Sequence, residues 1–368
     1  MPKMLSYNRE ASLVRPSPSR ACPELVEGGG KGGDGVGTWR THPHPSLPSF
    51  GDAQDRLEGE GIDLKLRDGI RAILLSIAIL VFASPSFAAL NILATTPEWG
   101  ALAKEIGGDK VSVYVATTAL QDVHHIEAKP SLIARARSAD LVIATGAELE
   151  VGWLPILQRE SGNRKIQQGS PGYFEAARML NLLDVPANID RSMGDVHPYG
   201  NPHVHLDPRN LMRVASALAQ RLGEIDGANK TNFDARNKSF QDRMTEAIKR
   251  WEAAAVPLKG VPVVVHHQDQ RYLTHWLGMK EVGALESKPG IPPGTGHLSD
   301  LLQSLRREPA KVILHSAYSD PKPSAWLAER SKIAAVTLPY TVGGSKEAKD
   351  LFGLFDDSIS KLLAGIKQ

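Results

Sequence analysis

From Leu90 to the end of the chain, short apolar runs alternate with longer amphipathic stretches. This alternation is typical of parallel sheets covered by helices, because the short runs are buried on both faces and the amphipathic stretches pack against them. The sequence therefore predicts an α/β protein with two similar lobes. The expected strands are residues 91–95, 111–116, 141–145 and 165–168 in the first lobe, and residues 261–266, 281–285, 312–314 and 334–338 in the second.

The amphipathic stretches predict the helices and the connection between the lobes. Asp207 and Pro208 open a helix over residues 209–222, since Asp is a good N-cap and Pro fits the first turn. Residues 230–255 form one long helix that joins the lobes as a rigid strut. The other expected helices are residues 97–106, 130–138, 149–158, 269–277, 297–307, 322–331 and 346–366. The expected domains are residues 90–208, 209–258 and 259–368.

The first 89 residues have a different composition. Residues 1–63 are rich in Pro and Gly without a periodic pattern, and we expect a disordered extension there. Residues 64–89 combine basic residues, an apolar core and a run of small residues, which is the pattern of a secretory signal peptide. The alternative, a membrane anchor, is disfavoured because the apolar run is short.

Two further observations concern this N-terminal part. Signal peptides begin the translated chain, and no methionine occurs between Met4 and Met179. We therefore expect translation to start near residue 64, at a non-AUG codon. The only cysteine, Cys22, lies in the extension, so the mature protein has no disulfide, no zinc–thiolate cluster and no cysteine to carry a lipid. These features predict a protein that is free in the periplasm and not lipid-anchored.

The charge gives no indication of nucleic acid binding. The 368 residues carry a formal net charge of +2, and basic residues are scattered among acidic ones rather than gathered with aromatics. We expect a monomer that does not bind nucleic acid.

Histidines form three groups along the mature sequence: His124 with His125, His197 with His203 and His205, and His266 with His267. A single histidine is more often a structural residue than a ligand. Three groups that each fall in a loop or at a strand end are different, because loops after parallel strands meet at one edge of a sheet. Imidazole is a common ligand of transition metals, so the pattern predicts one metal site built from distant loops.

The motifs around these histidines resemble a known family. Residues 122–127, which read Asp-Val-His-His-Ile-Glu, are similar to one signature of the zinc- and manganese-binding proteins of bacterial ABC importers, known as the cluster A-I or zinc-uptake family. Residues 200–208 resemble the second signature, and His267 with Tyr272 resembles the third. Residues 286–293 and 338–344 are similar to further family segments. The resemblance covers residues 90–368.

The resemblance implies a fold of two lobes joined by a long helix and a site with His124, His203 and His267 as metal ligands. It also implies capture of Zn²⁺, with Mn²⁺ as the other candidate ion, and delivery to the membrane permease of an ABC importer. The chain departs from the family at residues 338–340, where Leu-Pro-Tyr replaces an acidic fourth ligand before a Pro-Leu-Gly turn. Water, Glu286 or His315 are the candidates for the fourth position.

Other residues near the site have two interpretations. Asp122 and Glu127 are candidates to brace the loop of His124, and the alternative for Glu127 is to cap the helix that begins near Pro130. His125, His205 and His266 are either partners that orient a ligand or ordinary packing residues. An all-nitrogen ligand set favours Zn²⁺ over Mn²⁺.

Two other functions remain open at this point. Three histidines and a water also describe a catalytic zinc in a hydrolase or lyase. The sequence has neither a His-Glu-x-x-His helix nor a Gly-x-Ser-x-Gly turn, so we expect a binding protein and not an enzyme. The third possibility is a protein that binds a metal complex or a small organic ligand between the lobes, in a cleft lined by Trp99, Trp153 and Tyr272.

Overall fold

The structure is a computed structural model that describes residues 68–71, 89–187, 194–195 and 197–367. The predicted disordered extension and most of the predicted signal peptide lie outside these residues. Residues 68–71 are helical. Within the described parts of the chain, no helix has the length and apolar character needed to cross a membrane.

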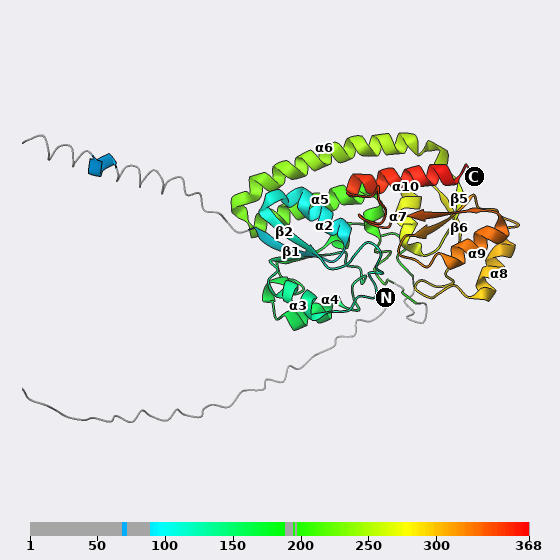
Figure 1. Ribbon diagram of the computed structural model, residues 1–368, viewed down its shortest axis with the longest axis horizontal. Coiled ribbons are helices and arrows are strands. Elements are labelled where there is room, and N and C mark those ends of the chain that lie inside the picture. The colour runs from blue at the N-terminus through cyan, green and yellow to red at the C-terminus, as the bar shows by residue number, and fades with distance from the viewer. Residues whose placement is uncertain (1–67, 72–88, 188–193, 196, 368) are drawn as a thin grey trace, which may run out of the picture. The chain divides into compact units, whose positions relative to one another are not determined.

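The first lobe is built on a four-stranded parallel sheet (Figure 1). Its strands run in the order β2-β1-β3-β4, with every neighbouring pair parallel. The strands are β1 (Leu90–Ala94), β2 (Val111–Val115), β3 (Leu141–Ala144) and β4 (Tyr173–Glu175), and the helices of this lobe are α2 (Pro97–Gly107), α3 (Pro130–Arg137) and α4 (Leu154–Ser161). Ile92 faces α2 and Leu93 faces α3 and α4, because successive side chains of a strand point to opposite faces.

The second lobe repeats this plan. Its sheet has the order β6-β5-β7-β8 and is also parallel throughout. The strands are β5 (Pro262–Val265), β6 (Lys280–Ala284), β7 (Val312–Ser316) and β8 (Ala334–Leu338), and the helices are α7 (Arg271–Trp276), α8 (Thr295–Ser304), α9 (Lys322–Ser331) and α10 (Leu351–Gly365). The predicted α/β fold of two similar lobes is therefore confirmed.

Helices α5 (Pro208–Ile225) and α6 (Lys230–Ala254) connect the two lobes. As predicted, Asp207 caps α5, since its side chain accepts a hydrogen bond from the backbone nitrogen of Arg209. Helix α6 has 25 residues and is therefore about 37 Å long. It runs past α2 and α5 at one end and past α10 at the other (Figure 1). The long connecting helix is thus present as predicted.

One apolar core extends beneath both lobes. It joins buried residues of β1 and α2 to those of β5, β7 and α10, and α6 contributes Phe233, Phe240, Met244 and Trp251 to it. Two smaller clusters lie on the outer faces of the sheets, one under α3 and α4 and the other under α8 and α9. Because the core is continuous, the two lobes are held together along the side on which α6 lies.

Two sequence-based boundaries in the first lobe were wrong. The segment 165–168 was expected to be a strand, but Arg164–Ile166 is a 3-10 turn in which the Asn163 side chain accepts a hydrogen bond from the Lys165 nitrogen. The strand of this region is β4, which begins only at Tyr173. Helix α4 begins at Leu154 rather than at residue 149, because Ala147 and Glu148 have positive φ angles that a helix does not allow.

The continuous core predicts a large cost for shortening a buried side chain of α6. Phe240 is fully buried, so Phe240→Ala should lower the free energy of unfolding by about 3–5 kcal/mol. Lys238 lies on the same helix with its side chain exposed, and Lys238→Ala should change stability by less than about 0.5 kcal/mol. Urea titration followed by tryptophan fluorescence measures both. An unchanged unfolding midpoint for Phe240→Ala would show that α6 does not depend on this core.

Candidate metal centre

Three histidines from distant loops meet at the carboxyl edges of the two sheets. His124 lies in the loop between β2 and α3, and His203 comes just before the 3-10 turn Val204–Leu206 that leads into α5. His267 directly follows β5. One ligand nitrogen of each ring lies within 4.8 Å of the other two. The ring centroids are 5.5 to 5.8 Å apart, so the three imidazoles form a nearly regular triangle.

Each of the three rings is held through its Nδ1 atom. Nδ1 of His124 is 2.8 Å from Oδ1 of Asp122, and Nδ1 of His203 is 2.7 Å from the hydroxyl of Tyr340. Nδ1 of His267 is 2.7 Å from Oε2 of Glu286. The carboxylates of Asp122 and Glu286 can only accept, so the lone pair of a neutral His124 or His267 ring is on Nε2. The same holds for His203 when the Tyr340 hydroxyl accepts the hydrogen bond from Nδ1. The geometry thus leaves three Nε2 atoms available to one ion.

The electrostatic surroundings of these rings differ. Burial would raise the pKa of Asp122, but hydrogen bonds from the side chain and backbone of His124 bring it down to about 2, so Asp122 is a carboxylate. Burial lowers the pKa of His203 well below its usual value, and the neighbouring His267 and His124 lower it further. Burial also acts to lower the pKa of His267, but the hydrogen bond to Glu286 and nearby acids raise it above its usual value.

A fourth imidazole, that of His197, approaches His124, although it lies outside the group of three whose ligand atoms are within 4.8 Å of one another. Nε2 of His197 is 3.3 Å from Nε2 of His124. Two nitrogens that share a tetrahedral zinc ion at about 2.0–2.1 Å are themselves roughly 3.3–3.4 Å apart, so this separation fits two ligands of one ion. Burial, and then the neighbouring His124 and His267, lower the pKa of His197 to about 3, which keeps its ring neutral. A cavity of about 140 Å³ borders His197, His203 and His267.

Two of these residues had weak signals in the sequence. His197 belongs to the middle histidine group, but the family signature in this group surrounds His203. Tyr340 stands where the sequence departs from the family. The structure shows that its hydroxyl bonds to His203 and that its carbonyl accepts a hydrogen bond from Nε2 of His205 at 2.8 Å.

The candidates for the fourth ligand lie in other places. Glu286 contacts the Nδ1 side of His267 and also accepts a hydrogen bond from the Gly290 nitrogen at 2.8 Å. His315 lies on β7, with its Nε2 2.8 Å from the Thr337 hydroxyl. Neither belongs to the group of three whose ligand atoms lie within 4.8 Å of one another.

The remaining histidines of the three groups take different roles. The side chain of His125 is 68% exposed. His205 is buried between Trp99 and Tyr340, with Nδ1 3.5 Å from Oε1 of Glu98. His266 is buried beside Glu286 at 3.8 Å. His205 thus contacts the tyrosine that bonds to His203, and His266 lies near the carboxylate that bonds to His267.

The three aromatic residues that were expected to line a cleft for an organic ligand do not do so. Trp99, Trp153 and Tyr272 are all buried, with at most 3% of their surface exposed. The indole nitrogens of the two tryptophans are bonded within the first lobe, to Thr145 and to the carbonyl of Val123. These three side chains pack in the protein and do not line an open cleft.

This chain is similar to known metal-binding transport proteins. Residues 92–365 match the protein family described as "Zinc-uptake complex component A periplasmic". The high-affinity zinc uptake system protein ZnuA of Yersinia pestis is 22% identical over 312 residues, which cover 79% of this chain and 95% of that protein. The metal ABC transporter substrate-binding lipoprotein ScbA of Streptococcus cristatus is 25% identical over 284 residues, which cover 76% and 89%.

A solved structure shares the fold. The Mn-bound periplasmic metal binding protein from Candidatus Liberibacter asiaticus superposes with a TM-score of 0.61 at 16% identity, over 75% of this chain and 98% of that one. The matched family consists of substrate-binding transport proteins and not of enzymes. Since the family match spans well over half of the sequence, this chain belongs to the periplasmic zinc-uptake complex component A family.

Proposed function

We propose that this protein captures Zn²⁺ between its two lobes through Nε2 of His124, His203 and His267 and delivers the ion to the membrane permease of an ABC importer. The observation that carries the proposal is the convergence of three imidazoles whose Nδ1 atoms are already engaged. Rings fixed in this way present their lone pairs to an ion without reorganisation. The family and the names of the relatives support the transport role.

The donor set favours zinc as the cargo. The three proposed ligands are all imidazole nitrogens, which suit Zn²⁺, whereas Mn²⁺ prefers carboxylate oxygens. The carboxylates of Asp122 and Glu286 bond to Nδ1 atoms, on the side of each ring opposite to the ion. The solved Mn-bound relative keeps Mn²⁺ as the second candidate ion.

We assign the fourth position to His197 rather than to Glu286. His197 approaches His124 at the separation expected for two ligands of one zinc ion, while Glu286 orients His267 from behind. Four nitrogens would complete a tetrahedral site and leave no open position, as in sites that hold zinc without catalysis.

The proposal also includes the location, oligomeric state and domain bounds of the protein. The mature chain is secreted into the periplasm, acts as a monomer without nucleic acid, and has domains at residues 90–208, 209–258 and 259–368. It is not lipid-anchored, because the sequence has no cysteine after Cys22 to accept a lipid. The Streptococcus cristatus relative, by contrast, is named a lipoprotein.

Removing a ligand should weaken zinc binding strongly. His124→Ala, His203→Ala and His267→Ala should each raise the dissociation constant for Zn²⁺ on the order of 100-fold or more, since each takes away one of a few metal bonds. His197→Ala should raise it by roughly tenfold or more, with a larger effect on Zn²⁺ than on Mn²⁺. Competition titration of metal-free protein against a chelator measures these constants.

His125→Ala is the matched control for the alanine series. His125 is adjacent to His124 in the sequence, but its side chain is largely exposed, so the variant should bind zinc like the wild type. Wild-type affinity in any of the three main variants would contradict the proposed ligand set. Wild-type affinity in His197→Ala alone would contradict only the fourth position.

The hydroxyl of Tyr340 should matter for affinity although it does not touch the ion. Tyr340→Phe keeps the ring but removes the hydrogen-bond partner of His203, and should weaken zinc binding by about 10–100-fold. Tyr114→Phe, on the partly exposed strand β2, is the control and should have no effect. If both variants bind zinc equally well, the orientation of His203 does not depend on Tyr340.

Zinc affinity should fall as the pH is lowered. The raised pKa of His267 means that this ring binds a proton first on acidification, and a protonated ring cannot bind metal. Below that pKa the dissociation constant should rise by up to about tenfold per pH unit, because one proton is displaced per ion bound. Titrations at pH 7.5, 6.5 and 5.5 measure this slope. The same affinity at all three values would rule out ligation by His267.

The pH effect has a matched variant. Glu286→Gln removes the carboxylate that raises the pKa of His267, so the loss of affinity should begin at a lower pH than in the wild type.

A further inference from the structure

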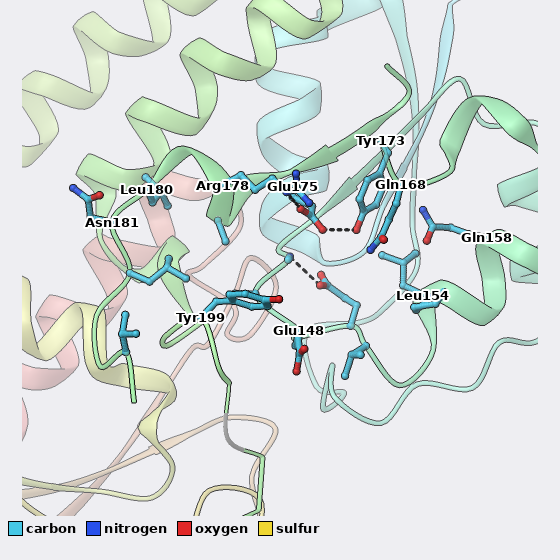
Figure 2. Close-up of a pocket in the computed structure, with 18 residues that line it drawn as sticks. Glu148, Leu154, Gln158, Gln168, Tyr173, Glu175, Arg178, Leu180, Asn181 and Tyr199 are labelled. Atoms are coloured by element: carbon cyan, nitrogen blue, oxygen red, sulfur yellow. Dashed lines mark hydrogen bonds and ion pairs between the residues drawn. The ribbon is translucent and has the colours of Figure 1, made fainter. Parts of the chain in front are cut away.

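A second and larger cavity lies in the first lobe. Its volume is about 950 Å³, which is in the range of pockets that hold small organic molecules. It is lined by the chain between β3 and α4, by β4 with the residues that follow it, and by Tyr199 (Figure 2). None of the three proposed metal ligands lines it.

The cavity lies where parallel sheets usually bind ligands. β3 and β4 are neighbouring parallel strands, and Gly146 and Glu175 mark their carboxyl ends in the cavity wall. Ligands of open α/β sheets gather outside such ends. Here Gly146, Ala147 and Glu148 all have positive φ angles, which turn the chain sharply away from β3. Two successive non-glycine residues in this conformation are unusual, and such backbone is found preferentially at binding sites.

A buried carboxylate holds this turn in place. Glu150 is 2% exposed and accepts hydrogen bonds from the backbone nitrogens of Thr145 and Gly146, at 2.7 and 3.0 Å, and from the Thr95 hydroxyl at 2.7 Å. These hydrogen bonds fix the backbone conformation of the turn. Glu150 is occupied by these three donors, and burial raises the pKa of its carboxyl group, so it holds the turn and offers the cavity no free acceptor.

The described residues that line the cavity include more acidic than basic side chains. They carry the carboxyl groups of Glu148, Glu150 and Glu175 and one guanidinium, that of Arg178. Glu175 accepts a hydrogen bond from the Tyr173 hydroxyl at 2.9 Å and forms an ion pair with Arg178. The Arg178 side chain is 71% exposed, whereas that of Glu175 is 12% exposed. The positive charge thus lies toward solvent and the carboxylate toward the interior.

Apolar and aromatic side chains form the rest of the wall. Leu154, Leu180 and Tyr173 lie around the cavity in Figure 2, and the ring of Tyr199 lies between Leu180 and Glu148 in that view. Tyr199 is 64% exposed and Val151 is 53% exposed, so large apolar side chains are left facing solvent at the rim. Exposed apolar surface gathered around a cavity indicates a binding site, and an aromatic face can also hold a cation.

We propose that this cavity is a second ligand site, for a small organic cation with an apolar body, such as an arylalkylamine. The ammonium group lies toward the carboxylate side of the cavity, near Glu175, and the apolar body packs between Leu154 and Tyr199. This site is distinct from the metal centre, and its existence does not depend on the proposed transport of zinc.

Three probes with the same aromatic body and different charges test the proposal. They are 2-phenylethylamine, 3-phenylpropionate and 2-phenylethanol, each titrated by calorimetry into the zinc-saturated mature protein. The amine should bind with a dissociation constant in roughly the millimolar range or tighter, and at least tenfold more tightly than the other two. Absence of binding by the amine, or equal binding by the carboxylate or the alcohol, would overturn the proposal.

Variants locate the bound amine and test its charge. Val151→Trp fills the rim and should weaken binding of 2-phenylethylamine at least tenfold, and Glu175→Gln should also weaken it. Arg178→Gln removes the guanidinium that pairs with Glu175 and should strengthen it. Glu160→Gln, on the exposed face of α4, is the matched control and should leave the affinity unchanged.

Zinc titration of each variant shows whether the protein is folded, since none of the substituted residues is a proposed metal ligand. Amine binding that survives Val151→Trp, or that is weakened by Arg178→Gln in a variant with normal zinc binding, would overturn the proposal. A variant that loses zinc binding as well is replaced by Tyr199→Ala, at an exposed side chain, for which the same loss of amine binding is expected.

Discussion

The metal centre depends on one repeated interaction, the hydrogen bond between Nδ1 of an imidazole and a fixed oxygen. A neutral imidazole has one N–H group and one lone pair, and a free ring can exchange them and rotate. Asp122, Tyr340 and Glu286 remove this freedom from His124, His203 and His267. The two carboxylates keep the proton of His124 and His267 on Nδ1 and so keep the lone pair on Nε2, and the Tyr340 hydroxyl fixes the orientation of the His203 ring. The site is therefore arranged for an ion before the ion arrives.

The three oxygens come from different parts of the chain, so the geometry of the site depends on the fold. Asp122 is in the same loop as its histidine, and Glu286 follows β6, the neighbour of the strand before His267. Tyr340 is different, because it follows β8 and reaches His203, which lies 137 residues earlier in the chain. The geometry of His203 is thus a direct consequence of how the two lobes meet.

Further bonds hold the loop of His203 against the second lobe. The Asn201 amide donates to the carbonyl of Gln268, and the Tyr272 hydroxyl donates to the carbonyl of Asn201, at 2.8 and 2.9 Å. Thr341 donates a hydrogen bond to Glu98 across the same boundary. Behind these polar contacts lies the continuous core to which α6 contributes. Because such contacts are buried, breaking any of them leaves a polar group without a partner, which makes the arrangement costly to disturb.

Much of this could be predicted from the sequence, because periodicity and strand order are local properties. The alternation of apolar runs gave the two parallel sheets, and the spacing of Phe233, Phe240 and Trp251 gave the long helix. The loops of His124, His203 and His267 could be expected to meet, since carboxyl ends of parallel strands share an edge. The segment 165–168 was misjudged because a side chain of Asn163 closes a turn there, which apolar patterning does not reveal.

The sequence does not predict which side chain bonds to which histidine within the site. Glu286 was considered as a ligand, but its place beside Nδ1 of His267 is set by the contact between two loops. The approach of His197 to His124 and the hydroxyl of Tyr340 on His203 are contacts over 73 and 137 residues. The sequence by itself determined which elements form and that three histidine groups lie in loops or at strand ends, because those follow from local patterns, while the choice of one ligand in each group came from the family resemblance. Only the tertiary structure decided which oxygen holds which ring, because a hydrogen bond depends on distances of a few ångströms between side chains that the chain order does not bring together.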